Sequence, residues 1–201
     1  MESPAPTKHA LEEFEKHGGV MKTSDALACG ISKQLLYRLR DEGKIVKLQK
    51  GLYQLADLDS ELDSDLITIA HKIPRGVLCL ISALDFHGLT TEIPHRIYLA
   101  LPYSMQKPHL SGIRIQYHWF SESAYSTGIQ IVQKDSATLR VYNSAKTVTD
   151  CFKFRNQIGL DVAVAALRDY LEQGGRPADL AMYAEVNRVS NVIRPYVEAH
   201  L

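Results

Sequence analysis

Apolar positions near the start of the chain recur at helical spacing. Leu11 and Phe14 stand among acidic residues, which predicts an amphipathic helix over residues 7–17. Gly18 and Gly19 follow, and glycine adopts the left-handed conformation of a helix end without strain. The chain is therefore expected to begin with one helix that ends at this glycine pair.

Two shorter helices are predicted next, over residues 25–29 and 33–42, after a short extended link at residues 20–21. Gly30 separates the two helices, and Ser32 precedes the second of them, where a serine can cap the free backbone amides of a helix start. The leucines of this last helix share one face, so its polar residues are expected on the other.

Beyond Gly43 the pattern changes from a helical period to alternation. Apolar and polar residues alternate over residues 44–55 on both sides of Lys50 and Gly51, which predicts a β-hairpin. Three short helices followed by a basic hairpin is the order of a winged helix-turn-helix, in which the second helix crosses the DNA backbone and the third enters the major groove.

The remainder of the chain predicts a second domain after an acidic and polar linker at residues 56–64. The expected elements are a helix (65–72), a buried strand (77–80), a short helix capped by Ser82, three or four strands (96–101, 113–120, 129–133, 138–142) and C-terminal helices (145–154 capped by Ser144, 161–172, one from Pro177 and one from about residue 190). Strands first and helices afterwards favour an α+β fold. We predict a winged helix-turn-helix DNA-binding domain at residues 1–56. Residues 57–201 are then a mixed α/β domain with antiparallel strands and C-terminal helices.

Charge is distributed unevenly along the chain. The 201 residues include 23 basic and 23 acidic ones, so the formal net charge is zero. Residues 30–53 nevertheless hold six basic residues against two acidic ones, a local net charge of +4. A basic patch within a neutral protein indicates a module that binds a polyanion, joined to a domain with another role.

Composition also indicates where the protein works. No apolar run reaches the roughly 18 residues that a membrane span needs, and the N-terminus lacks the basic start and apolar stretch of a signal peptide. We expect a cytoplasmic protein without a membrane partner.

The three cysteines are far apart and odd in number, so they are expected to be apolar core residues rather than a disulfide framework.

The candidate DNA-binding residues on the third helix lie off its leucine face. They are Ser32, Lys33, Gln34, Tyr37, Arg38 and Arg40. Lys33, Gln34 and Tyr37 are expected to reach base edges, because residues near the start of a recognition helix do so. The planar fork of Arg38 suits either a guanine or a phosphate. The alternative is a solvated helix face that binds nothing.

The candidates on the hairpin are three lysines, Lys44, Lys47 and Lys50. Lysines there would neutralise phosphates without reading the base sequence, so affinity for DNA should fall steeply with salt. The alternative is that they protect an edge strand against aggregation.

No arrangement typical of catalysis or metal binding stands out. The sequence has no P-loop, no dinucleotide-binding glycine loop and no HExxH motif, and none of its eight histidines is spaced from another like metal ligands on a helix. Asp150 and Cys151 lie on an apolar helix face, which favours packing. Ser82, Asp85 and His87 share one short helix and cannot converge as a triad. We therefore predict that the protein is not an enzyme and has no catalytic residue, metal or cofactor.

The predicted strands carry a mixture of aromatic and basic residues: Tyr98, Tyr103, Arg114, Tyr117, His118 and Trp119. Alternation would place Ile113, Ile115 and Tyr117 on one face and Arg114, Gln116 and His118 on the other. A sheet with one core face and one solvated face is the simplest interpretation, and a second contact surface for a partner or for DNA stays open.

Short motifs spread along the chain resemble one family. The first group is Gly18-Gly19-Val20, Thr23-x-x-Ala26-x-x-x-Gly30-Ile31-Ser32, Leu36-x-x-Leu39-x-x-x-Gly43-Lys44-Ile45 and Lys50-Gly51-Leu52-Tyr53. The second group is Ile73-Pro74-x-Gly76-Val77-x-Cys79-Leu80-x-Ser82-Ala83-Leu84, His87-Gly88-Leu89-Thr90, Pro94 and Thr147-Val148-x-Asp150-Cys151. In this order they resemble the two domains of the AbiEi antitoxins, which belong to bacterial abortive-infection systems that protect against phage.

The resemblance implies a function for each domain. The winged helix-turn-helix would bind repeats in the promoter of its own operon, as double-stranded DNA, and repress it. The second domain would neutralise a neighbouring toxin of the nucleotidyltransferase type, in type IV fashion, without necessarily forming a stable complex. No toxin-countering residue carries over from the family. The alternative is a stand-alone transcriptional regulator whose second domain senses a ligand or binds another protein.

Overall fold

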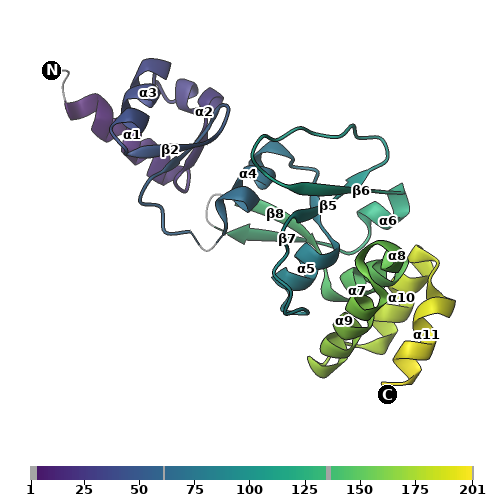
Figure 1. The fold of residues 1–201 in the computed structure, drawn as a ribbon. Coiled ribbons are helices and arrows are strands. Elements are labelled where there is room, and N and C mark those ends of the chain that lie inside the picture. The colour runs from purple at the N-terminus through teal and green to yellow at the C-terminus, as the bar shows by residue number, and fades with distance from the viewer. Residues whose placement is uncertain (1–3, 61, 135–136, 201) are drawn as a thin grey trace. The chain divides into compact units, whose positions relative to one another are not determined.

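The computed structural model describes residues 4–60, 62–134 and 137–200 (Figure 1). Contacts divide the chain into two compact units. The N-terminal unit comprises residues 1–74 and 133–139, and the C-terminal unit comprises residues 75–132 and 140–201. Both units contain helices and strands, and helices α7–α11 follow the strands of the C-terminal unit, so the expected α+β fold class is confirmed.

The N-terminal unit begins as a winged helix-turn-helix. Its elements are, in order, α1 (Pro4–Lys16), β1 (Val20–Lys22), α2 (Thr23–Ala28), α3 (Lys33–Asp41), β2 (Ile45–Gln49), β3 (Leu52–Leu55) and α4 (Ser64–Lys72). The strands form an antiparallel sheet in the order β1-β3-β2. The link expected at residues 20–21 is a strand, because Val20 lies opposite Gln54 of β3 and pairs with it.

One hydrophobic core holds these elements together. Its buried members are Ala10, Phe14, Met21, Ala26, Ile31, Leu36, Leu39, Ile45, Tyr53 and Leu55. Leu36 and Leu39 are 1% and 0% exposed, and burying a leucine side chain contributes about 1.5–3 kcal/mol. Burial of the leucine face fixes the rotation of α3 about its axis, and therefore fixes which of its side chains meet solvent.

The turn before α3 depends on two residues. Gly30 has a φ of +80°, a conformation that L side chains rarely adopt. The Ser32 hydroxyl oxygen accepts a hydrogen bond from the Leu35 amide at 3.2 Å, as expected for an N-cap. These features set the angle at which α3 leaves α2.

The wing consists of β2, β3 and the turn between them. Lys47 lies opposite Tyr53 and Gln49 opposite Leu52, with a register shift between the two pairs. Beyond the wing, α4 packs against β2 and belongs to the N-terminal unit. The domain boundary expected after residue 56 stays a prediction.

The elements after α4 are β4 (Val77–Leu78), α5 (Leu80–Phe86), β5 (Ile97–Pro102), β6 (Ile115–Phe120), α6 (Glu122–Ser126), β7 (Ile129–Lys134), β8 (Ala137–Tyr142), α7 (Ser144–Lys153), α8 (Arg155–Ile158), α9 (Leu160–Glu172), α10 (Pro177–Asn187) and α11 (Ser190–Glu198). The sheet order is β6-β5-β4-β8-β7. The sheet is mixed: β4 and β5 are antiparallel, as expected, while β5 runs parallel to β6 and β4 parallel to β8, which the sequence did not predict. Residues 103–114 connect β5 to β6 and are long enough for the crossover that a parallel pair needs.

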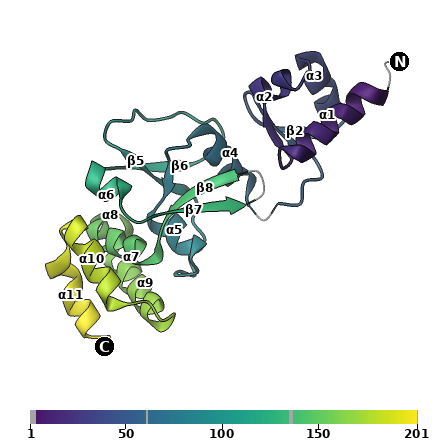
Figure 2. The same cartoon turned by 180° about the vertical axis from the view of Figure 1, so that it is seen from behind.

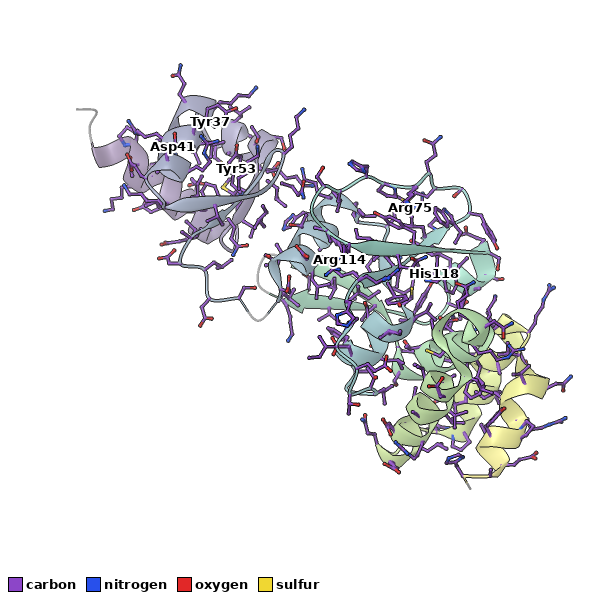
Figure 3. All side chains as sticks on the ribbon, in the orientation of Figure 1. Tyr37, Asp41, Tyr53, Arg75, Arg114 and His118 are labelled. Carbon is purple, nitrogen blue, oxygen red and sulfur yellow. The ribbon has the colours of Figure 1, made fainter. Side chains whose placement is uncertain are left out.

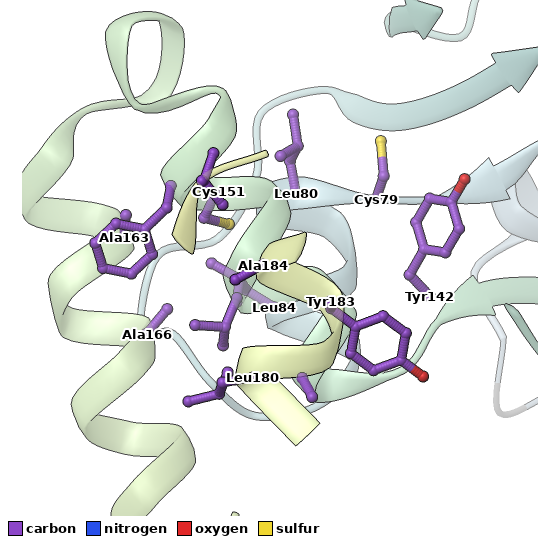
Figure 4. Packing of buried hydrophobic residues seen from close by; sticks show 14 of the residues in the cluster. Cys79, Leu80, Leu84, Tyr142, Cys151, Ala163, Ala166, Leu180, Tyr183 and Ala184 are labelled. Carbon is purple, nitrogen blue, oxygen red and sulfur yellow. The ribbon is translucent and has the colours of Figure 1, made fainter. Parts of the chain in front are cut away.

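The helix α7 lies at the centre of the C-terminal core. Both α9 and α10 pack against it, as the two opposite views in Figure 1 and Figure 2 show. Every α7 residue from Ala145 to Phe152 is buried. Figure 4 shows Cys79 and Cys151 among the apolar side chains of this core, and both are 0% exposed. The core role expected for these two cysteines is therefore confirmed.

Two predicted helix caps are wrong. The cap of α7 is Asn143 rather than Ser144, because the Asn143 side chain accepts from the Lys146 amide at 2.8 Å. Ser82 lies inside α5, and its hydroxyl accepts instead from the Tyr98 amide at 2.9 Å. That hydrogen bond connects α5 to β5.

A buried ion pair crosses one turn of α7. Lys146 Nζ lies 2.5 Å from an Asp150 carboxylate oxygen, and both side chains are 0% exposed. Asn187 of α10 donates to the same carboxylate at 2.7 Å. The ammonium also lies 4.3 Å from the centre of the Tyr142 ring and 5.0 Å from that of Phe120. Burial raises the pKa of Asp150, while Lys146 opposes that shift.

Removing one partner of this pair should destabilise the protein strongly. Lys146→Met leaves the Asp150 charge buried without its counter-ion, so the free energy of unfolding in urea should fall by about 3–5 kcal/mol. The control is the double variant Lys146→Met/Asp150→Leu, which removes both charges and should recover at least half of the loss. Equal losses in the single and double variants would contradict an ion-pair role.

Candidate nucleic-acid interface

One face of α3 is free of the core and carries polar side chains. Lys33, Gln34, Tyr37 and Arg40 are all exposed, and Tyr37 is 48% exposed although its ring is large and apolar. Positions spaced three and four residues apart lie on the same side of a helix, so these side chains form one continuous stripe. Such a stripe at the start of the third helix has the composition and position of a recognition surface.

Tyr37, Arg40 and Asp41 form a chain of contacts at the end of this stripe. The Arg40 guanidinium lies 5.3 Å from the centre of the Tyr37 ring, and its Nε and terminal nitrogen donate to one Asp41 oxygen at 2.9 and 2.7 Å. Figure 3 shows Tyr37 and Asp41 on α3 with Tyr53 nearby. The hydrogen bond from Arg40 to Asp41 raises the pKa of Arg40. Burial raises the pKa of Tyr53, and the nearby Tyr37 raises it further.

The Arg40–Asp41 pair shows what the guanidinium could bind. Arg40 and Asp41 side chains are 40% and 66% exposed, and ion pairs so exposed contribute only about 0–1 kcal/mol. The carboxylate occupies the position in which a phosphate would accept the same two hydrogen bonds. Exchanging Asp41 for a phosphate of DNA would therefore cost little.

The wing adds basic side chains beside α3. Lys47 lies directly opposite Tyr53, and residues opposite one another in an antiparallel pair point to the same face of the sheet. Lys50 lies at the exposed turn of the wing. Neither lysine nor Lys33 makes an ion pair within the described residues. These three cations are therefore available to phosphates.

Two further lysines gather at the wing turn, and sequence reasoning missed both. Lys72 Nζ donates to the main-chain oxygen of Lys50 at 2.7 Å, and Lys22 lies opposite Leu52 of β3. Burial lowers the pKa of Lys72, and the nearby charge of Lys22 lowers it further. The sequence places Lys72 on a helix beyond the linker, and no local pattern brings that helix to the wing.

Arg38 and Lys44 lie apart from the rest of the predicted site. The Arg38 guanidinium contacts the Thr7 hydroxyl of α1 at 3.4 Å and Glu42 at 3.8 Å. Lys44 pairs with Glu42 at 2.7 Å, and that hydrogen bond lowers the pKa of Glu42. Lys44 also borders a hollow lined by α1 residues. The structure therefore does not bring these two residues into the exposed stripe of α3, and their contact with DNA stays a prediction.

The alternation of apolar and polar residues predicted one solvated face for the sheet of the C-terminal unit, but less of that face meets solvent than expected. Tyr117 and His118 are adjacent in β6, yet they are 8% and 5% exposed, so both faces are covered at this point. The His118 ring stacks on Tyr98 and meets Phe154 edge-on. Desolvation lowers the pKa of His118, which favours the neutral form of the ring. Alternation places His118 on the face opposite Tyr117, and Phe154, between α7 and α8, packs against His118 and Phe120 on β6, which explains why that face is dry.

The N-terminal region is similar to one known protein family. Residues 9–56 match the profile of a family described as transcriptional regulator, AbiEi antitoxin. The resemblance found in the sequence is therefore confirmed for residues 9–56, which are similar to this family of transcriptional regulators. No protein with curated annotation matches the chain.

A solved structure shares the fold. The crystal structure of the RV2827C protein from Mycobacterium tuberculosis is similar over 100% of this chain and 82% of that one, with a TM-score of 0.58 and 15% sequence identity. This likeness concerns the fold alone. Separately, none of the helices in the described part of the chain has the length and apolar character needed to cross a membrane.

Replacing wing lysines should weaken binding to duplex DNA without regard to sequence. Lys47→Ala and Lys50→Ala each remove one cation that is free for a phosphate. Each should reduce the slope of log affinity against log salt by about 1, measured by fluorescence anisotropy on a random duplex. Lys8→Ala is the matched control, since Lys8 is an exposed lysine of α1 outside this surface. If Lys8→Ala reduces the slope as much as the wing variants, the wing has no special role.

Proposed function

We propose that this protein is a DNA-binding transcriptional autorepressor and the antitoxin of a type IV, AbiE-like toxin–antitoxin system. The supporting observation is the exposed stripe of α3, flanked by unpaired lysines of the wing, within the region that matches AbiEi regulators. Its DNA target would be repeats in the promoter of its own operon.

Within this proposal the residues divide their work. Lys33, Gln34 and Tyr37 lie nearest the start of α3 and would meet base edges in the major groove. Lys47 and Lys50, joined by Lys22 and Lys72, would contact phosphates and fix the register on the duplex. Arg40 would exchange Asp41 for a phosphate.

The C-terminal part would supply the antitoxin activity against a nucleotidyltransferase-type toxin. The family match of the N-terminal region and the motifs of residues 73–94 and 147–151 support this assignment. A stable complex with the toxin is not required. We also propose that the protein is not an enzyme, which agrees with the complete burial of Asp150 and Cys151.

A second candidate is a stand-alone regulator with a ligand-sensing C-terminal domain. One observation favours it: a groove of about 450 Å³ lies between α10 and α11 and is lined mainly by apolar residues such as Leu180, Ala184 and Ile193. Grooves of this size and character accept small apolar ligands.

Replacing a base-contacting residue should weaken binding to the promoter more than binding to a duplex of random sequence. Lys33→Ala should weaken the complex with the protein's own promoter by about 1–3 kcal/mol, measured by electrophoretic mobility shift at fixed salt. Binding to a random duplex should change less. An equal loss on both duplexes would mean that Lys33 contacts only phosphate.

Repression and toxin neutralisation should be separable in the full-length chain. The double variant Lys33→Ala/Lys47→Ala should lose repression of a promoter reporter, yet it should rescue growth when co-expressed with the toxin encoded beside its gene. The wild-type chain serves as the positive control for both readouts. Failure of the wild type to rescue growth, with repression intact, would favour the stand-alone regulator.

A further inference from the structure

Three side chains of different kinds meet where α1 passes the end of α2. Glu13 lies in the last turn of α1, and His17 directly follows α1, with its amide still donating to the Glu13 carbonyl. Cys29 is the residue that ends α2. A carboxylate oxygen of Glu13, a ring nitrogen of His17 and the Cys29 sulfur all lie within 4.8 Å of one another. Carboxylate, imidazole and thiolate are the three ligand types that zinc takes in proteins.

The hydrogen bond of the His17 ring suits a metal ligand. Its Nδ1 lies 2.8 Å from the main-chain oxygen of Glu13. A neutral imidazole that donates its Nδ1 proton to this carbonyl keeps the lone pair on Nε2. Metal-bound histidines commonly use their second nitrogen in this way, because the hydrogen bond fixes both the tautomer and the ring orientation.

The carboxylate of Glu13 is withdrawn from solvent and already holds a cation. Its side chain is 14% exposed, and Lys16 Nζ lies 2.6 Å from one oxygen. Lys16 itself is 66% exposed, so its ammonium is free to swing into water when another cation takes its place. The Cys29 sulfur lies within 4.8 Å of a carboxylate oxygen of Glu13, which places it next to this acidic group.

We propose that Glu13, His17 and Cys29 bind a thiophilic divalent cation of the zinc class, linking α1 to the helix-turn-helix. Ligand atoms around tetrahedral zinc, with bonds of about 2.0–2.3 Å, lie roughly 3.5 Å apart, so small side-chain rotations complete the site. Three protein ligands leave a fourth position for water or an added ligand. The thiolate selects zinc, cobalt or copper over magnesium and calcium, which prefer oxygen. The site is independent of the proposed contacts with DNA.

Sequence reasoning overlooked this group because it searched for histidines spaced from one another. The informative spacing is instead a glutamate and a histidine at i and i+4, which lie on the same side of a helix. Cys29 joins them only through the fold, because it lies 12 positions after His17 in the chain, beyond β1 and α2.

Cobalt titration of the full-length, reduced protein tests the proposal. Cobalt bound by a thiolate absorbs in the near ultraviolet by charge transfer from sulfur, and Cys79 and Cys151 are 0% exposed and cannot supply that signal. The wild type should show the band at one cobalt per chain. Cys29→Ser should abolish it, and His17→Ala should weaken zinc binding, measured by competition against cobalt, by more than the roughly 10–100-fold cost of losing an outer-shell partner.

Two more variants separate a metal site from a structural contact. His200→Ala is the matched control, because His200 Nδ1 also lies 2.7 Å from the carbonyl four residues earlier, that of Tyr196, yet His200 is outside the group. It should bind cobalt as the wild type does. Lys16→Gln removes the competing ammonium and should tighten zinc binding several-fold. No charge-transfer band in the wild type, or an equal band in Cys29→Ser, overturns the proposal.

Discussion

Burial of the leucine face of α3 is the constraint on which the proposed interface depends. Leu36 and Leu39 fill the core between α1, α2 and the wing, and almost none of their surface reaches solvent. Turning the helix by a quarter would expose these side chains and bury charged ones, at a cost of several kcal/mol. The orientation of Lys33, Tyr37 and Arg40 therefore follows from packing on the opposite side of the same helix.

Ion pairs reduce the number of cations that are free to meet DNA. Residues 30–53 hold six basic residues, but Arg40, Arg38 and Lys44 each face an acidic partner. The cations that remain available lie on the start of α3 and on the wing. Exposed ion pairs are weak, so Arg40 can still exchange partners. Arg38 instead contacts Thr7 of α1, and Lys44 borders a hollow that Leu11 and Glu15 of α1 help to line. The lysines brought in by β1 and α4 restore positive charge at the wing turn.

Features that depend on local pattern were predictable from the sequence. The helix-turn-helix, the Ser32 cap and the wing follow from periodicity, glycine positions and capping chemistry over a few residues. Features that depend on distant partners were not. The parallel pairing of β5 with β6 needs a crossover whose direction leaves no local trace, and the place of Lys72 beside Lys50 arises only when α4 packs on the wing. For the same reason the sequence did not predict that Cys29 lies beside Glu13, since only folding brings the sulfur to α1.

The most direct test of the account is a map of the surface that contacts DNA. Backbone amide chemical shifts of the full-length protein, recorded by NMR during titration with its promoter duplex at low ionic strength, provide that map. The account predicts that the largest changes fall on residues 33–41 and 45–51 and fade as salt is added, because phosphates supply most of the binding. Changes concentrated between residues 75 and 132, or an unchanged spectrum, would contradict it.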